Sequence, residues 1–302
     1  MEPHPDFIKA GKIAAEVMRH AIPHVKPEES VLKICELVEK QIVAYGGRPA
    51  FPCNVSINQE AAHYSSPYGD KRVFPGTGLV KVDIGAHVNG HLSDTAYTVD
   101  LDGSYDNYIF AARNALNAAI DAVKPGVKLG EIGSIIERVI KSHNLRPIHQ
   151  LSGHQMKPWS LHAGKNVPNI GSKFTSKMKA GETYAIEPFA TDGNGTIKAA
   201  SEAYIYSNDM KNKKKTDRES RRVRDAARKA FGTLPWASRW LHGKLKGVDV
   251  DAAINNLTHL GILRAYPVLI EGQGGMVSQF EHTVFVGEEK TIVTTRRCNE
   301  IV

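Results

Sequence analysis

Two aspartates, Asp83 and Asp94, lie in a segment whose sequence predicts a β-hairpin. Residues 79–88 form a strand-like run, Asn89-Gly90 is a strongly favoured two-residue turn, and residues 91–99 return as a second strand. This turn places Asp94 two positions away from the residue that faces Asp83. Because side chains alternate with a period of two, the carboxylates share one face of the hairpin as diagonal neighbours, roughly 7 Å apart.

A pair of carboxylates in an otherwise apolar hairpin requires an explanation. Without a partner they would repel each other and lose hydration. An exposed polar face is the alternative, but both faces of the first strand carry apolar residues, namely Leu79, Val80, Val82 and Ile84. We therefore predict that a divalent cation binds between Asp83 and Asp94.

Three further residues of metal-binding type lie near predicted strand ends or in loops. They are His154 in Ser-Gly-His-Gln, Glu187 in Tyr-Ala-Ile-Glu-Pro, and Glu281 in Gln-Phe-Glu-His-Thr. Alone, each is weak evidence, because a single Glu on a strand is usually solvated and a single His is usually only hydrogen-bonded.

In chain order, the five residues resemble the metal-ligand set of the methionine aminopeptidases. The flanking sequences carry the same resemblance, namely Asn-Gln-Glu-Ala-Ala-His63, Val-Asp83-Ile-Gly, Ser93-Asp94-Thr-Ala, Gly153-His154, His162-Ala-Gly-Lys, Ala185-Ile-Glu187-Pro-Phe and Phe280-Glu281-His-Thr. The resemblance extends over nearly the whole chain. It implies a dinuclear metallopeptidase.

The resemblance also assigns roles to the five ligands. Asp83 would chelate one metal, Asp94 and Glu281 would bridge both, and His154 and Glu187 would complete the second. Such an oxygen-rich set suits cobalt, manganese or iron ions and differs from a structural zinc site built on thiolates. Zinc and nickel are alternative ions. Glu187 would in addition act as the general base.

Two histidines and three apolar residues complete the implied site. By resemblance, His63 and His162 would be catalytic residues that hydrogen-bond the substrate near the scissile carbonyl and stabilise the oxyanion, and the alternative is that they are packing histidines. Phe51, Leu161 and Tyr266 match the positions that line the methionine pocket in the family.

An internal repeat predicts how these residues are positioned. A shift of 98 residues aligns Val25-Lys26-Pro27 with Val123-Lys124-Pro125, and Arg48-Pro49 with Arg146-Pro147. Each copy predicts two amphipathic helices separated by a Lys-Pro turn and followed by strands. We expect two half-domains related by a pseudo-two-fold axis. The family resemblance implies the α+β pita-bread fold around a dinuclear metal site.

The separation of the last two ligands indicates an insertion. Glu187 and Glu281 are 94 positions apart, whereas type I enzymes connect the corresponding strands more directly. The chain thus resembles the type II enzymes, and the sequence Ser-Gly-His-Gln-Met-Lys-Pro-Trp-Ser-Leu-His around His154 resembles their short archaeal form. We expect a catalytic domain in 1–207 and 271–302, and an inserted basic subdomain in 208–270.

The expected inserted subdomain has a winged-helix-like shape. Thr216 to Glu219 predicts a capping box at the start of its first helix. A short second helix is expected in 235–241, and Asp249 caps a third. The runs 262–270 and 276–286 predict a hairpin that forms the wing.

Positive charge is concentrated in the same segment. The chain has a net charge of +7, and residues 208–270 hold 14 Lys and Arg against 6 Asp and Glu, which leaves 25 basic and 26 acidic residues elsewhere. A localised basic block favours a polyanionic partner. We expect docking on the ribosome or its RNA through Lys211–Lys229; a solvated helix face is the alternative.

Composition and the N-terminal sequence argue against membrane-spanning, disulfide-rich and secreted proteins. A chain of 302 residues with 41% hydrophobic residues has no apolar run near the ~20 residues of a membrane helix. Three scattered cysteines, Cys35, Cys53 and Cys298, do not form a disulfide framework. The N-terminus resembles no secretory signal. We expect a cytoplasmic monomer without a membrane partner.

The family resemblance implies an aminopeptidase that removes the initiator methionine from nascent chains whose second residue is small. A proline-specific peptidase of the same fold is one alternative. A non-catalytic relative that binds RNA or ribosomes is another, although such proteins lose metal ligands and this chain retains all five.

Overall fold

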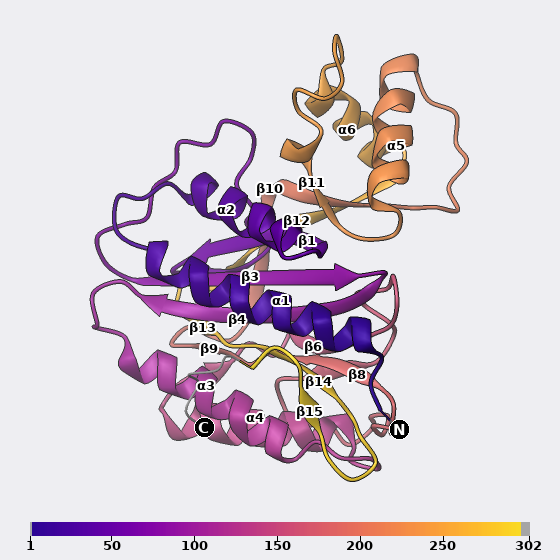
Figure 1. Cartoon of the computed structure of the whole chain (residues 1–302). Helices are drawn as coiled ribbons and strands as arrows, with labels where there is room; N and C mark the ends of the chain where they lie inside the picture. Colours follow the sequence, from indigo (N-terminus) through magenta and orange to yellow (C-terminus); the bar gives the residue numbers. More distant parts are fainter. Residues whose placement is uncertain (1, 297–302) are drawn as a thin grey trace.

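The sequence repeat corresponds to two helix pairs in the computed structural model, which describes residues 2–296 (Figure 1). The first pair is α1 (Pro5–Ala21) and α2 (Val31–Ala44), and the second is α3 (Asp106–Asp121) and α4 (Leu129–Ser142). Each pair buries its apolar face in a separate hydrophobic cluster against the strands of its own half. The predicted repeat of two half-domains is therefore confirmed in the structure.

The first half contains a three-stranded antiparallel sheet. Its order is β1 (Arg48–Ile57), β3 (Leu79–Val88), β4 (His91–Asp100). Asp83 pairs with Ala96 and Asp94 with Gly85, so the predicted hairpin register is confirmed. Both aspartates consequently project from the same face.

The second half supplies two sheets. The larger has the order β15-β14-β8-β6-β7 and the smaller the order β13-β9-β5. Their strands are β5 (Arg146–Pro147), β6 (Ser152–Met156), β7 (Asn166–Pro168), β8 (Thr183–Ile186), β9 (Phe189–Thr191), β13 (Val277–Gln279), β14 (His282–Phe285) and β15 (Ile292–Val293).

The two halves meet along β4. A bridge pairs Ala96 with Glu281, and the Thr283 hydroxyl accepts a hydrogen bond from the Asp94 N–H at 2.7 Å and donates one to the Asp94 carbonyl, also at 2.7 Å. Residues from distant parts of the chain are thereby fixed beside the aspartate hairpin.

The basic segment forms a small body with its own hydrophobic core. It contains α5 (Arg218–Phe231), β11 (Trp236–Ala237), the 3₁₀ turn η2 (Ser238–Trp240) and α6 (Val250–His259). Figure 1 shows this body above the first half, joined to it through β10 (Ile197–Asn208) and β12 (Leu263–Glu271). A four-stranded sheet in the order β11-β10-β12-β2 connects them, where β2 is Glu60–Ala62.

The predicted wing hairpin between 262–270 and 276–286 is wrong. β12 pairs with β10 and β2, whereas β13 pairs with β9 and β14 with β8 and β15. The buried Glu271 explains the difference, because its carboxylate accepts hydrogen bonds from the N–H groups of Gly195, Gln273 and Gly275. These contacts turn the chain out of the sheet after β12.

The predicted helix boundaries in the same body are partly correct. Asp217, not Thr216, caps α5 by accepting the Ser220 N–H at 2.9 Å. Asp249 caps α6 as predicted, through the Ala252 N–H at 3.0 Å. The segment 235–241 forms the two-residue strand β11 and the three-residue 3₁₀ turn η2 in place of the predicted helix.

Cys35 and Cys53 are buried free thiols, and Cys298 lies outside the described residues. Of the helices that the structure describes, none is both long enough and apolar enough to cross a membrane.

Candidate metal centre

The five predicted ligands converge from both halves of the molecule. Asp83 lies on β3, Asp94 on β4 and His154 on β6, while Glu187 directly follows β8 and Glu281 lies between β13 and β14. All five line one cavity of about 290 Å³. The first half therefore contributes the two aspartates on one side of the cavity, and the second half contributes the other three ligands.

Close contacts define the centre of this cavity. His154 Nε2 lies 3.5 Å from Asp94 Oδ2 and 3.9 Å from Glu187 Oε1. One donor atom each from Asp94, His154 and Glu281 lie within 4.8 Å of one another. These spacings are close enough for a single ion to contact all three side chains.

Some buried carboxylate oxygens of this centre lack a hydrogen-bond partner in the part of the chain that the structure describes. Asp83 Oδ1, Asp94 Oδ1 and Glu281 Oε2 are buried and accept no hydrogen bond from the described residues. An unsatisfied buried polar atom is costly, and a charged one more so. Three such oxygens facing one cavity fit a cation.

The pKa values of the carboxylates support this interpretation. Burial raises the pKa of Asp94 to about 7, and burial followed by repulsion from neighbouring carboxylates raises the pKa of Asp83, Glu187 and Glu281 well above the usual range. No Lys or Arg of residues 2–296 forms an ion pair with any of the four. A divalent cation would supply the missing positive charge, and the oxygen-rich donor set suits one.

The two predicted histidines lie at the rim of the metal centre. His63 Nδ1 lies 3.2 Å from the Pro267 carbonyl, and the His63 ring meets Tyr266 edge to face at 5.7 Å. The His162 ring lies 4.3 Å from that of His154. Burial lowers the pKa of His63 to about 4 and that of His162 to about 3, so both are neutral near pH 7.

The protonation of His63 follows from its hydrogen bond. Because a carbonyl oxygen only accepts, Nδ1 carries the proton and donates it to Pro267. Nε2 of the neutral ring is then an unprotonated lone pair. His63 also has a left-handed backbone (φ 69°), which indicates that its position is tightly determined by its surroundings.

Apolar side chains form part of the cavity wall. Phe51, Leu161 and Tyr266 line it, so the structure brings together all ten residues that the sequence singled out. Sequence patterns did not identify nine others, namely Asn54, Ala62, Gln150, Leu151, Ser152, Asn166, Phe189, Ile205 and Pro235. Asn54 pairs with Asp83 across β1 and β3, and Pro235 enters from the basic body. These positions depend on pairing between strands and on the docking of a separate body.

Comparisons with known proteins agree with this geometry. The sequence pattern of metallopeptidase family M24 matches residues 6–288. A methionine aminopeptidase of Saccharolobus solfataricus is 43% identical over 293 residues, which cover 96% of this chain and 97% of that protein.

Solved structures match over nearly the whole chain. A structure of a thermophilic Arx1 superposes with a TM-score of 0.85 at 16% identity, covering 99% of this chain and 93% of that chain. A methionine aminopeptidase of Thermotoga maritima superposes with a TM-score of 0.71 at 21% identity, covering 97% and 98%. These likenesses concern the fold, and they confirm the pita-bread fold expected for the two halves.

Proposed function

This chain belongs to metallopeptidase family M24, and we propose that it is a methionine aminopeptidase of the type II, archaeal-like form. It removes the N-terminal methionine from polypeptides. The observation that carries this proposal is a single cavity lined by four buried carboxylates, one buried imidazole and an apolar wall. The insertion of residues 208–270 between Glu187 and Glu281 supports the type II assignment.

Two divalent cations fit the charge of the site. Asp83 would hold one ion, His154 and Glu187 the other, and Asp94 and Glu281 both. Four carboxylates and a neutral imidazole leave four negative charges, which two divalent ions balance. When bound, such ions supply Lewis acidity, lowering the pKa of water and steadying charge in the transition state. Cobalt, manganese and iron are the ions we favour for this donor set.

Glu187 is the residue that we assign to proton transfer. It lies at the end of β8 against the cavity, and burial raises its pKa, which favours acceptance of a proton during the reaction. Gln279 Nε2 lies 3.5 Å from Glu187 Oε2 and helps to hold the carboxylate in one orientation.

His63 and His162 are the residues that we assign to substrate binding. With Nδ1 of His63 donating to Pro267, its Nε2 is available to accept an N–H from the substrate. His162 remains the candidate donor to the developing oxyanion. Phe51, Leu161 and Tyr266 would enclose the methionine side chain, and we expect the second residue of the substrate to be small.

The remaining assignments concern partners and location. We place the enzyme in the cytoplasm as a monomer that acts on nascent N-termini. The exposed residues Lys213, Lys214, Lys215, Arg221 and Arg222 support docking of the Lys211–Lys229 face on ribosomal RNA.

Peptide cleavage tests the proposed activity. Metal-reconstituted enzyme should release methionine from Met-Gly and Met-Ala peptides, but not from Met-Leu or Met-Lys peptides, and chelation should stop the release. Release that survives exhaustive chelation, or equal cleavage whatever the second residue, would rule the proposal out. Preferential cleavage of Xaa-Pro peptides would instead favour a proline-specific peptidase of the same fold.

A further inference from the structure

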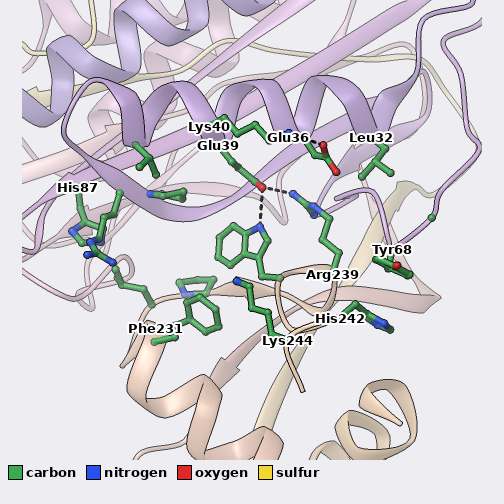
Figure 2. Close-up of a pocket in the computed structure, with 18 of the residues that line it drawn as sticks. Leu32, Glu36, Glu39, Lys40, Tyr68, His87, Phe231, Arg239, His242 and Lys244 are labelled. Carbon is green, nitrogen blue, oxygen red and sulfur yellow. Dashed lines mark hydrogen bonds and ion pairs between the residues drawn. The ribbon is translucent and has the colours of Figure 1, made fainter. Parts of the chain in front are cut away.

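A second, larger cavity lies between the first half and the basic body. Its volume is about 1020 Å³, and Figure 2 shows its lining residues. Leu32, Glu36, Glu39 and Lys40 on α2 form one side. Phe231 at the end of α5, with Arg239, His242 and Lys244 beyond it, forms the other. None of the ten predicted site residues lines this cavity.

A network of buried polar groups holds the two sides together. Arg239 forms an ion pair with Glu39, and Trp240 Nε1 donates to Glu39 at 2.7 Å. Arg239 also donates to the Ser65 hydroxyl at 2.7 Å and to the Ser66 carbonyl at 3.0 Å. Figure 2 shows the ion pair of Glu39 with Arg239 between the walls. These contacts therefore fix the two sides of the cavity relative to each other.

Trp159 is held at the cavity in a strained and exposed conformation. Its backbone is left-handed (φ 62°), which is unfavourable for a bulky residue. Its backbone N–H donates a hydrogen bond to the Gly90 carbonyl at 2.9 Å, and its backbone carbonyl accepts one from the Thr233 hydroxyl at 2.6 Å. The residue is nevertheless 49% exposed, and its ring lies 5.0 Å from His87. The surroundings thus fix an indole that still faces solvent.

Tyr68 provides a second exposed ring. It is 67% exposed and stacks on His242 at 4.8 Å, with the ring planes inclined by only 5°. His242 is itself held by Asp251, at 3.0 Å from Nε2. This stack joins the first half to the basic body at a different part of the lining from His87 (Figure 2).

The charges that line the cavity leave an excess of positive charge. Lys40 pairs with Glu36 at 3.0 Å, and Arg239 pairs with Glu39. Arg48 and Lys244 also line the cavity, and no carboxylate of residues 2–296 lies within ion-pair distance of either. Two fixed aromatic rings and two unpaired cations therefore face the same space.

We propose that this cavity binds single-stranded RNA, with unpaired bases stacked on Trp159 and Tyr68 and phosphates near Arg48 and Lys244. Aromatic rings beside a positively charged groove are the combination that binds single strands, because every base has a π-face and every phosphate a charge. An apolar peptide would use the rings but not the two cations. The inference rests on the proposed ribosomal docking for the source of the RNA.

Binding of a fluorescent single-stranded RNA octamer, followed by anisotropy in low salt, tests the proposal. Trp159→Asn removes the indole while keeping a residue that tolerates a left-handed backbone. Trp159→Asn and Tyr68→Ala should each weaken binding roughly five- to a hundredfold, as expected when one stacked base is no longer supported. Phe174→Asn is the matched control, because Phe174 is 98% exposed and lies outside the cavity. Its affinity should be unchanged.

The cations are tested through the salt dependence of the same binding. Arg48→Gln with Lys244→Gln should lower the slope of log affinity against log salt by about 1.4, or about 0.7 for each phosphate that is no longer neutralised. Lys26→Gln with Lys124→Gln, two exposed lysines outside the cavity, should leave the slope unchanged.

Other outcomes would contradict the inference. It is wrong if the wild type does not bind the octamer, or if both ring variants bind it with wild-type affinity. Displacement of the octamer by an apolar peptide with no dependence on Arg48 or Lys244 would assign the cavity to a protein partner. Should Trp159→Asn fail to fold, the binding measured for Tyr68→Ala and for Arg48→Gln with Lys244→Gln decides whether the inference is correct. Methionine release from a tripeptide should be unchanged in all of them, so failure here is separate from failure of the proposed activity.

Discussion

The metal-centre cavity and the larger cavity share a wall and have opposite electrostatic characters. Pro235 lines both of them, and its neighbour Leu234 packs with Phe51 and Leu161. On one side, four buried carboxylates have no cationic side chain of residues 2–296 as an ion-pair partner. On the other, the carboxylates are paired and two cations are not. An unbalanced charge indicates a ligand of opposite sign, and here it indicates metal cations in one cavity and phosphates in the other.

The cavities also differ in how they are built. The metal centre lies where two halves of one repeat meet, and its ligands sit on or next to strands that are fixed by regular pairing. The larger cavity lies where a separate body docks, and irregular segments such as the loop of Trp159 provide much of its lining. Strand pairing fixes the geometry of the metal-centre cavity, whereas the second cavity depends on the contact between Arg239 and Glu39.

The largest effect is expected from removing a carboxylate that we propose bridges both ions. Asp94→Ala or Glu281→Ala should lower kcat for methionine release by at least about a thousandfold, because each side chain would serve both ions. Metal analysis after equilibrium dialysis should find fewer than two ions per chain. Asp121→Ala, which removes an exposed carboxylate on α3, is the control and should keep both properties. Near-normal turnover with two ions bound in either variant would refute the ligand assignment.

His63 lies at the rim of the metal cavity and is not one of the predicted metal ligands. Its reaction with an alkylating agent therefore tests the rim separately from the centre. If the chain is of the proposed type II form, an epoxide of the fumagillin class should alkylate His63, and intact-mass analysis should show one adduct that is absent in His63→Ala. Because burial lowers the pKa of His63 to about 4, the imidazole is already unprotonated at pH 6. The rate should therefore change little between pH 6 and pH 8 on account of this group.

Two results would contradict that prediction. An adduct mapped to His162 or to another residue would show that Nε2 of His63 does not face the cavity as its bond to Pro267 implies. A rate that rises steeply through pH 6.5 would show that His63 titrates as an ordinary exposed histidine.

Sequence patterns predicted the regular elements around the metal centre well. Asn89-Gly90 determines the hairpin register locally, and the repeated Lys-Pro turns mark the helix pairs, so both could be predicted without knowledge of distant contacts. The ten candidate site residues, which line one cavity, were singled out because the flanking sequences resemble those of one family. That resemblance could identify positions, whereas it could not supply distances.

The parts that could not be predicted depend on long-range contacts. The false wing hairpin looked regular locally, but Glu271 turns the chain and β12 pairs with β2, some two hundred positions earlier. Asn54 reaches the site only through a strand pairing that contains register shifts. The exposed Trp159 had no distinguishing sequence pattern, because its significance depends on Gly90 and Thr233.

Lys81 is a buried basic residue outside both cavities. Its replacement should affect the stability of the fold and its pH dependence, and this effect should be smaller than those on catalysis. Burial lowers the pKa of Lys81 to about 7, and its Nζ donates to the carbonyls of Asn58 and Val277, each at 2.8 Å. An unfolded lysine has a pKa near 10.4. Between these values the unfolded chain binds a proton that the folded chain lacks, so the free energy of unfolding should rise with pH.

The expected rise is about 2 kcal/mol between pH 7 and pH 9. Urea denaturation at both pH values should find it in the wild type and not in Lys81→Met. Lys33→Met, at an exposed position on α2, is the control and should keep the wild-type difference. An equal rise in Lys81→Met would assign the pH dependence to other groups.

The smallest effect on catalysis is expected from the basic face, which lies outside both cavities. Lys213, Lys214, Lys215, Arg221 and Arg222 are exposed and line neither cavity. Reversing these charges should weaken co-sedimentation with ribosomes in low salt, since each neutralised phosphate adds to the salt dependence of binding. Cleavage of a free tripeptide should not change, because a short substrate does not require docking.

The same variant separates the basic face from the larger cavity. If the face supplies long-range attraction and the cavity supplies stacking, charge reversal should lower ribosome binding. In the separate octamer assay, the wild type should still bind the RNA more tightly than Tyr68→Ala does. The effect of charge reversal should disappear at high salt, where screening removes it, whereas the weakening caused by Tyr68→Ala should persist, because stacking depends little on ionic strength. Unchanged co-sedimentation after charge reversal would leave the basic face as a solvated surface, and the cavity would then be the remaining candidate for contact with RNA.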